Sequence, residues 1–407
     1  MTNDEIRRIL KDTDCVRLSG TPEEHAAAGY LKGLCEAMHV PAHTEGFPVR
    51  MSDKVAASLT ADGVSVPCKG YRLCGTADLE APFYYMPNKD KASLAGAKGK
   101  IVLLDGGLPY WTYQDLYDNG ALGFITYDGD LVFADSDIDH KTLRPHVSKG
   151  RIIPGVSINA KDALKLVQSA PETVRITVSQ TESDGESLNV IAELPGETDE
   201  WIVMTAHYDT TSLSHGAYDN MTGCIGLLGV MEALKDRPHR RGVRFIFCGS
   251  EECGLLGSKA YVQAHEAELG RIALNINLDM IGTWMGRFFT CVTAEDRLMH
   301  HIEYLCAEEG FGIEAKQGVY ASDSTPFADK GVPALSFARL TTQNQGRIHT
   351  RYDTAALISD GQLLKDIAFI ASFAARMADA AVCPVSRDIP EKLKTELDEY
   401  LNRRRKN

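Results

Sequence analysis

The chain has 407 residues, 44% of them hydrophobic, and a formal net charge of −13. This length predicts two domains, and the acidic balance argues against a nucleic-acid partner, because phosphate binding requires a basic face. No apolar stretch reaches the ~20 residues of a membrane span, and the charged start MTNDEIRRILKD does not resemble a signal peptide. We therefore expect a cytoplasmic protein with no membrane partner, and free thiols at its ten cysteines, which include no C-x-x-C pair.

The first 45 residues are predicted to be helical. Thr21, Pro22 and Glu24 form a helix start, with Thr as N-cap, Pro at the first position and Glu three residues after the cap. The helix then continues through AAAGYLKGLCEAM.

Residues 46–183 differ in character, because they are β-rich and contain many turns. Short strands are predicted at 101–104, 122–127, 152–158 and 174–178, with helices around 113–117 and over 160–168. The polar stretch TESDGES at 181–187 is predicted to be an exit linker. We therefore expect residues 46–183 to form a domain inserted into a first domain of residues 1–45 and 184–383.

From residue 188 onward, strands and helices alternate. Strands are predicted at 188–194, 201–206, 243–249, 272–279, 288–293 and 332–337, and helices at 220–235, 255–266, 295–309 and 359–380. Apolar runs such as VRFIFC indicate strands buried on both faces. The expected fold class is therefore α/β, with a mixed, largely parallel sheet flanked by helices.

The last segment, 384–407, is predicted to contain an amphipathic helix over 389–402 and a basic tail. The apolar stripe of the helix is Ile389, Leu393, Leu397 and Leu401. This stripe indicates packing, either within the chain or at a subunit contact of a homo-oligomer. The basic run at 403–406 is interpreted as a solvated tail.

Five residues that can bind metal lie at strand ends or in tight loops: His207, Asp219, Glu252, Asp279 and His349. Two imidazoles and three carboxylates suffice for two zinc-like ions. Three of these residues follow successive apolar strands, where open α/β sheets place their sites. Because a carboxylate has two oxygens, Asp219 can bridge two cations.

Two further carboxylates adjoin these candidate ligands. Glu251 lies beside Glu252 after the strand VRFIFCGS, and adjacent residues at a strand end point in different directions. Glu252 is therefore the predicted ligand and Glu251 the predicted general base for a metal-bound water. Asp209, two residues after His207, is predicted to accept the other imidazole N–H and so to orient the ring.

The segments AHYDT, GAYDNMTG, GSEECGLLGS, NLDMIG, SDSTPF and IHTRYDT occur in an order that resembles the co-catalytic dizinc aminopeptidases, a family that includes the glutamate carboxypeptidases. The resemblance implies a zinc-exopeptidase-like fold with Asp219 bridging, one ion completed by His207 and Asp279, and the other by Glu252 and His349. It also implies a cis peptide bond between Asp219 and Asn220. The insert resembles a protease-associated domain, around KGKIVLLDGG, DNGALGFITYD and RIIPGVSINAKDALKLV.

The chain departs from the family pattern at two points. The family loop reads Ser-Asp-His before its aromatic residue, whereas this chain has Ser322-Asp323-Ser324, in which Asp323 is the candidate substrate contact. His215 is an additional imidazole, for which a loop role is favoured over a substrate contact or a further metal ligand.

The expected reaction is metal-assisted amide hydrolysis of a peptide by two zinc ions, for which cobalt or manganese are possible substitutes. Tyr320 is a candidate to stabilise the tetrahedral intermediate, with an ordinary half-buried aromatic as the alternative. An aminopeptidase is the leading hypothesis. A carboxypeptidase or dipeptidase for acidic peptides is the alternative, with Arg339, Arg347 or Arg351 as carboxylate contacts or as structural ion-pair partners. A single-zinc aminoacyl cyclase and an inactive binding module are further hypotheses, which the complete ligand set disfavours.

Overall fold

The chain folds into two compact units, which a computed structural model describes over residues 1–132, 137–342 and 345–406. The first unit consists of Met1–Val49 and Glu186–Asn407, and the second of Arg50–Gly185. The boundaries predicted from the sequence lie after residues 45 and 183. All ten cysteines are free, as predicted.

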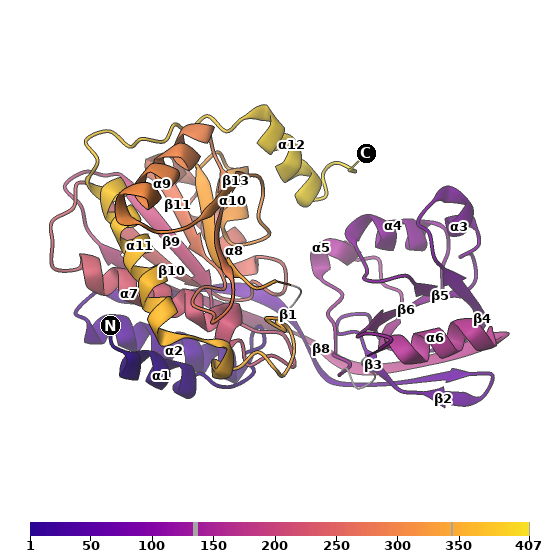
Figure 1. Ribbon diagram of the computed structural model, residues 1–407. Coiled ribbons are helices and arrows are strands. Elements are labelled where there is room, and N and C mark those ends of the chain that lie inside the picture. The colour runs from indigo at the N-terminus through magenta and orange to yellow at the C-terminus, as the bar shows by residue number, and fades with distance from the viewer. Residues whose placement is uncertain (133–136, 343–344, 407) are drawn as a thin grey trace. The chain divides into compact units, whose positions relative to one another are not determined.

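The first unit is built on a mixed sheet with the strand order β13-β12-β14-β11-β9-β10-β8 (Figure 1). Its strands are β8 (Thr173–Leu194), β9 (Trp201–His207), β10 (Gly242–Cys248), β11 (Ile272–Leu278), β12 (Arg287–Thr293), β13 (Glu314–Gln317) and β14 (Ala334–Leu340). The strands β10, β9, β11 and β14 run parallel to one another, as do β12 and β13, while β8 and β12 run antiparallel to β10 and β14. This arrangement confirms the predicted fold class, although β13 was not predicted.

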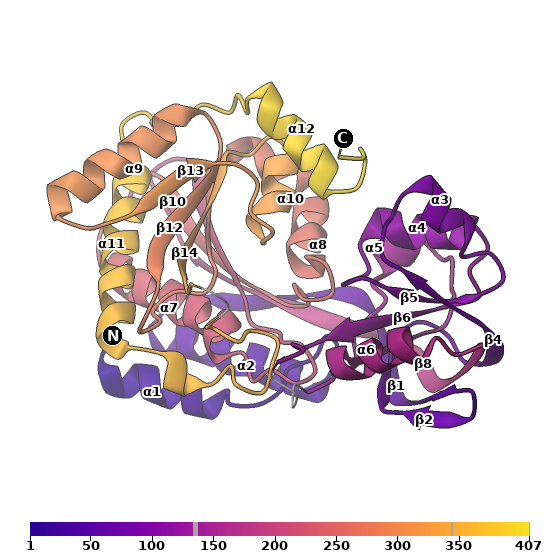
Figure 2. The ribbon, with the colours of Figure 1, turned by 45° about the vertical axis from the view of Figure 1, so that its right-hand side comes forward.

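The helices of the first unit cover both faces of this sheet (Figure 2). They are α1 (Asn3–Asp12), α2 (Pro22–Ala37), α7 (Thr222–Leu234), α8 (Leu256–Ala264), α9 (Asp296–Glu309), α10 (Ser324–Asp329), α11 (Asp360–Asp379) and α12 (Glu391–Tyr400). On β9, Ile202 and Met204 pack into the core shared with α1, α2, α7, α9 and α11, whereas Val203 packs into the core shared with α8 and α10. The two-residue repeat of a strand thus buries β9 on both sides and explains its apolar sequence.

The start of α2 follows its sequence signal only in part. Thr21 is the N-cap, its hydroxyl accepts the backbone N–H of Glu24, and Pro22 occupies the first turn, as predicted. The carboxylate of Glu24, however, does not complete a capping box on Thr21. It accepts the backbone N–H of Gly20 and three donors from outside the helix, so this side chain serves a tertiary contact.

The second unit has a core of its own around the strand order β4-β5-β6-β7-β3. Its elements are β2 (Val64–Val66), β3 (Cys68–Gly70), β4 (Ala77–Met86), α3 (Lys91–Ala95), β5 (Ile101–Leu104), α4 (Tyr110–Asp118), β6 (Gly123–Asp128), α5 (Pro145–Ser148), β7 (Gly155–Asn159) and α6 (Ala160–Ser169). The strands and helices predicted between residues 101 and 168 lie at these positions. The assignment of this unit as a protease-associated domain stays a prediction.

The chain passes between the two units within two long strands, at which two predictions from the sequence were wrong. Strand β1 (Ala42–Ala61) begins inside the region predicted to be helical, and β8 continues through TESDGES, which was predicted to be a linker. The two strands pair with each other. Cross-strand contacts stabilise this polar stretch as a strand, because Arg50 bonds to both Glu182 and Asp184.

The C-terminal helix α12 packs within the chain. Ile389, Leu393 and Leu397 are buried against Ala328 and Ala334. The predicted stripe is therefore a packing surface at its first three positions, while Leu401 is half-buried. In the basic run, Arg403 forms a bidentate pair with Asp329, so this residue is not only solvated. None of the helices in the described residues is long and apolar enough to span a membrane.

Candidate metal centre

The parallel strands β9, β10 and β11 end at the same edge of the sheet and bring four candidate site residues together. His207 is the last residue of β9 and lies in register with Cys248, the last residue of β10. Glu251 and Glu252 follow β10 within a short loop, and Asp279 directly follows β11. Because carboxyl ends of parallel strands converge, residues more than 70 positions apart in sequence meet here.

Two groups of potential metal ligands form at this edge, and they share one residue. His207, Asp219 and Asp279 make one group, and Asp219, Glu252 and His349 make the other, with donor atoms of each group within 4.8 Å of one another. Each oxygen of Asp219 faces a different imidazole: Oδ1 lies 3.2 Å from Nε2 of His207, and Oδ2 lies 3.1 Å from Nε2 of His349. Asp219 therefore has the geometry that a bridging carboxylate requires, and its role as the bridge stays a prediction.

The residues present fit two zinc ions. Imidazole nitrogens and carboxylate oxygens are the ligands that zinc accepts at N/O sites. Among the described residues, Oδ1 of the buried Asp279 has no hydrogen-bond partner, although it lies 3.9 Å from Nε2 of His207. Burial, followed by the charges of Asp219, Asp323 and Glu252, raises the pKa of Asp279 to about 8. A divalent cation at this position would give the unpaired oxygen a partner. Its positive charge would also offset the repulsion between Asp279 and the neighbouring carboxylates.

The surrounding carboxylates raise the pKa of both imidazoles above the ordinary value. The His349 side chain is 46% exposed; partial loss of solvent lowers its pKa, but Glu252 and Asp219 outweigh that effect and raise the pKa to about 11. His207 behaves alike: burial opposes protonation, yet Glu251, Asp209 and Asp219 hold its pKa well above the ordinary value. Burial likewise raises the pKa of Asp219, but its contacts with both imidazoles lower it overall. Metal binding requires neutral imidazoles, so zinc would displace these protons.

Glu251 adjoins the site without belonging to either ligand group. Its side chain is 15% exposed, and Oε2 lies 4.0 Å from Nε2 of His207. Burial raises the pKa of Glu251 well above its ordinary range, and the charges of Glu252, Asp323 and Asp279 add to that effect, while His207 opposes it. A carboxyl group with a raised pKa beside a metal site is suited to accept a proton.

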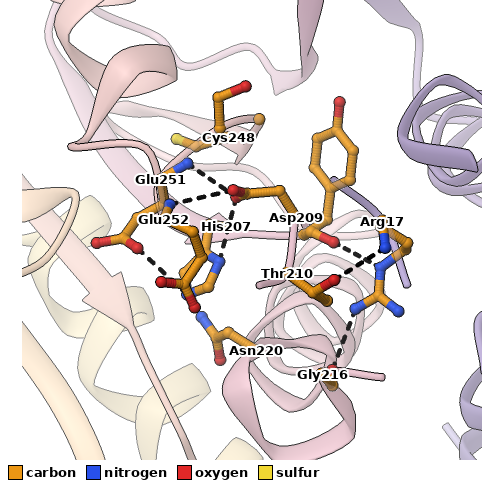
Figure 3. Close-up of polar contacts among 12 residues, drawn as sticks. Arg17, His207, Asp209, Thr210, Gly216, Asn220, Cys248, Glu251 and Glu252 are labelled. Atoms are coloured by element: carbon orange, nitrogen blue, oxygen red, sulfur yellow. Dashed lines mark hydrogen bonds and ion pairs between the residues drawn. The ribbon is translucent and has the colours of Figure 1, made fainter. Parts of the chain in front are cut away.

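Asp209 does more than the sequence predicted. Its Oδ1 lies 3.4 Å from Nδ1 of His207 but does not reach hydrogen-bond geometry. Its two oxygens instead accept the backbone N–H groups of Glu251 and Glu252, at 2.8 and 3.1 Å (Figure 3). One buried carboxylate thus lies beside His207 and holds the loop that carries Glu251, the predicted base, and Glu252, a predicted ligand.

The loop of the bridging residue is held by Asp353 and Asn220, for which the sequence predicted no role in the site. Asp353 is fully buried and accepts the backbone N–H groups of Tyr218 and Asp219, at 2.7 and 3.1 Å. Asn220 donates to the carbonyl of Leu278, one residue before Asp279. The peptide bond between Asp219 and Asn220 is cis, as predicted. The location of Asp353 within IHTRYDT was the one signal that could have revealed its role.

Tyr320 lies close to the carboxylates of the site. Burial raises its pKa above the ordinary value, and the charges of Asp279, Asp219 and Glu251 raise it further. The phenol is therefore protonated and able to donate a hydrogen bond. This position is compatible with the predicted role of Tyr320, although its ring is also partly buried against Phe289.

The structure corrects the substrate role predicted for Asp323. Its side chain is 1% exposed, and it accepts the hydroxyl of Ser258 at 2.5 Å. The serine that replaces the family's histidine, Ser324, is also buried, where its hydroxyl lies within 3.0 Å of the hydroxyls of Ser322 and Ser336. This loop is therefore buried, and most of its polar groups bond to other buried side chains, although Oδ2 of Asp323 has no hydrogen-bond partner among the described residues.

Arg339 forms a structural ion pair, which is the alternative that the sequence offered to a substrate contact. Its guanidinium forms a bidentate ion pair with the fully buried Asp366, at 2.8 and 2.6 Å. Arg351 stacks over Tyr352, with 5.1 Å between the guanidinium carbon and the ring centroid. His215 pairs with Asp14 at 2.7 Å, which agrees with the loop role favoured for it.

Residues 189–374 match the model of peptidase family M28. This segment, a little under half of the chain, is therefore similar to peptidase family M28. Aminopeptidase YwaD of Bacillus subtilis is 28% identical over 337 residues, which are 79% of this chain and 71% of YwaD. The probable lipoprotein aminopeptidase LpqL of Mycobacterium tuberculosis is 28% identical over 309 residues, 70% of this chain but only 59% of LpqL. These matches confirm the predicted family and the assignment of the chain to the metallopeptidases.

A solved structure has the same fold as this chain. BSAP, a zinc aminopeptidase from Bacillus subtilis, matches with a TM-score of 0.77 and 24% identity, over 96% of this chain and 97% of BSAP. At this identity the likeness concerns the fold alone. It agrees with the sheet and helix layers described above.

Proposed function

We propose that the protein is a dizinc aminopeptidase that removes the N-terminal residue of peptides, with Glu251 as general base. The observation that carries this proposal is the position of Asp219, whose two oxygens face two different imidazoles. Beside these two groups lies Glu251, a largely buried carboxyl that belongs to neither of them. A shared pair of ligand groups with a separate base is the arrangement that metal-assisted hydrolysis requires.

In this proposal His207, Asp219 and Asp279 hold one ion, and Asp219, Glu252 and His349 hold the other. Two zinc ions, when bound, lower the pKa of a water and polarise the scissile carbonyl. The zinc aminopeptidase among the solved structures supports zinc as the metal. Cobalt or manganese remain possible substitutes, because N/O sites also follow metal availability.

The protein's own groups move the proton and stabilise charge. Glu251 takes a proton from the attacking water and delivers it to the leaving amine. Its raised pKa suits the first transfer, because a more basic carboxylate takes the proton of the water more readily; the amine nitrogen then receives that proton as the C–N bond breaks. Tyr320 remains protonated beside the carboxylates and donates to the developing oxyanion.

The aminopeptidase reading is favoured over a carboxypeptidase by the charges of the site. A substrate with a free α-amine is attracted by a carboxylate-rich site, whereas a C-terminal carboxylate needs a cation. Arg339, the predicted cation, is already paired with Asp366. YwaD and LpqL, which are named as aminopeptidases, support the same choice. Both ligand groups are complete, which disfavours a single-zinc cyclase and an inactive binding module.

The test uses aminoacyl-anilides with a free amine, the same compounds acetylated, and N-blocked peptides that end in an acidic residue. We expect cleavage of the free-amine compounds alone, lost with a chelator and restored by zinc. In Glu251→Gln, kcat should fall by about 10²- to 10⁴-fold with two zinc ions per chain retained. Glu266→Gln is the matched control, because Glu266 pairs with Lys330 outside the site.

Cleavage of the N-blocked acidic peptides alone would replace the aminopeptidase by a carboxypeptidase. If the chain binds no zinc and cleaves none of these substrates, the proposal that it is an enzyme is refuted. Loss of zinc from Glu251→Gln would make this residue a ligand and not the base. The protease-associated insert, the cytoplasmic location and a homo-oligomer stay predictions from the sequence.

A further inference from the structure

Glu24 is a fully buried carboxyl group on α2, far in sequence from the metal centre. Its Oε1 accepts the hydroxyl of Ser187 at 2.7 Å, and both the backbone N–H and the hydroxyl of Ser250 at 3.1 Å. Its Oε2 accepts the backbone N–H of Gly20 at 2.6 Å. Among the described residues, no cationic side chain forms an ion pair with Glu24. Burying a carboxyl group without a cationic partner costs free energy of folding, which points to a function for its contacts.

The contacts of Glu24 are part of a pattern in the loop that carries the base. All four successive backbone N–H groups of residues 249–252 donate to buried side chains. Asn189 accepts from Gly249, Glu24 accepts from Ser250, and the two oxygens of Asp209 accept from Glu251 and Glu252. The three acceptors come from β8, from α2 and from the segment after β9. This loop is therefore held in place by three separate elements of the first unit.

The loop needs this support because its backbone is unusual. Ser250 has a φ of 55°, in the left-handed region that a residue with a Cβ rarely adopts. At Gly249 a Cβ would lie 2.5 Å from the hydroxyl of Ser187 and 3.1 Å from Oε1 of Glu24. Glu24 thus contacts the loop at its most strained residue, directly before Glu251. A strained conformation persists only where its surroundings hold it.

We propose that Glu24 is a positioning residue for the reaction, which holds the Gly249–Ser250 turn so that Glu251 faces the reacting water. The inference rests on the proposed function of Glu251. It adds to that function a residue from the N-terminal helix, which lies outside the segment that matches the family model. Without the acceptor at Ser250, the loop would keep its contacts to Asp209 and Asn189 but lose the one that fixes the turn.

The environment of Glu24 agrees with a role other than stability. Burial, and then the charge of Asp209, raise the pKa of Glu24 to about 8, and donors on Ser187, Gly20 and Ser250 offset only part of that rise. Burial, and then the charge of Glu24, raise the pKa of Tyr208. A carboxyl group in these surroundings lowers stability when charged, so a purely structural site would favour an apolar or amide side chain.

The experiment compares Glu24→Ala with Glu24→Gln in the full-length, zinc-loaded chain. Alanine removes the acceptor, whereas the glutamine carbonyl can still accept the N–H of Ser250. We expect kcat on a free-amine leucine anilide to fall by about 10- to 100-fold in Glu24→Ala, with KM and zinc content unchanged. In Glu24→Gln, kcat should stay within about threefold of wild type, because the contact to Ser250 survives.

Two matched controls separate positioning from loss of stability. Glu23→Ala changes the exposed neighbour on α2, and Leu31→Ala removes a fully buried side chain from the same helix. Leu31→Ala should lower the melting temperature but leave kcat unchanged. If Leu31→Ala lowers kcat as much as Glu24→Ala does, the proposal is overturned, and so it is if Glu24→Ala keeps the wild-type kcat. If Glu24→Ala does not fold, Glu24→Asp replaces it. The aspartate side chain is one methylene shorter, so its carboxylate no longer reaches Ser250.

A double-mutant cycle with Glu251→Asp tests whether Glu24 acts through the base. If it does, replacing Glu24 costs less in the Glu251→Asp background than in the wild type, whereas additive losses overturn the proposal. Hydrogen exchange gives a readout that does not depend on activity: the peptide containing residues 249–252 should exchange faster in Glu24→Ala than in wild type. Unchanged exchange overturns the proposal. If the wild type cleaves no free-amine substrate, the proposed function fails, and exchange alone then decides whether Glu24 holds the loop.

Discussion

Asp353 accepts the backbone N–H of Asp219 at 3.1 Å. The carboxylate shared by the two ligand groups is therefore held through its own backbone by a second buried carboxylate. Asp209 has the same relation to Glu251 and Glu252. In both loops the supporting carboxylate accepts backbone N–H groups, so the side chains of Asp219, Glu251 and Glu252 are not used for this contact. The ligand positions are thus set by contacts that do not need a metal ion.

We expect Asp353→Asn to weaken zinc binding. The asparagine oxygen can replace one of the two acceptors, but its amide group cannot accept the N–H of Asp219, so the bridging loop loses a contact. The loss should be about 10- to 100-fold in zinc affinity, measured by competition with a chelating dye. Asp360→Asn, which alters a pair with Arg7 away from the metal centre, is the control. An affinity equal to that of wild type would leave Asp353 without the role assigned to it.

Removal of zinc should lower the melting temperature. The centre brings Asp219, Glu252 and Asp279 together with only two imidazoles as their cationic partners among the described ion pairs. Binding to the folded chain alone contributes about 4 kcal/mol when free zinc is a thousandfold above Kd. Differential scanning calorimetry with and without chelator measures the shift, and Asp279→Asn should reduce it. Equal melting temperatures in both conditions would contradict a folded-state zinc site.

The pair formed by Arg339 and Asp366 should contribute to stability and not to substrate choice. Asp366 is fully buried, so Arg339→Ala leaves an uncompensated charge and should destabilise the protein by about 3 to 5 kcal/mol. Urea denaturation measures this loss. Arg351→Ala, at an exposed arginine, should have little effect on stability. Weaker cleavage of acidic peptides in Arg339→Ala, without loss of stability, would revive the carboxypeptidase alternative.

Glu24 should make stability depend on pH. Its pKa rises from 4.5 in the unfolded chain to about 8 in the fold, so its protonated form is favoured in the native state. The stability linked to this proton is complete below pH 4.5 and is lost as pH rises through 8. Relative to Glu24→Gln, the wild type should therefore lose at most about 4 kcal/mol between pH 5 and 9, given 1.36 kcal/mol per pH unit. Denaturation of both proteins at several pH values measures this difference, and a constant difference would contradict the buried, neutral carboxyl.

The sequence by itself determined most of the strands and helices of the first unit and the residue types of the candidate ligands. Apolar strands followed by His207, Glu251-Glu252 and Asp279 predicted a site at one sheet edge, because parallel strands bring their carboxyl ends together. The resemblance to a known family then assigned Asp219 as the bridge. Local pattern also predicted the cap of α2 by Thr21 and the packing stripe of α12.

Only the tertiary structure decided which polar side chains support the site and which merely pack. Asp323 lies in the motif SDSTPF and Arg339 precedes the last candidate ligand, but both side chains bond to partners from other elements of the fold. Glu24 carried the signal of a capping box, yet its carboxylate reaches Ser250, 226 residues along the chain. Local propensity cannot reveal such contacts, because the partner of a buried polar group is set by the packing of distant elements and not by neighbouring residues.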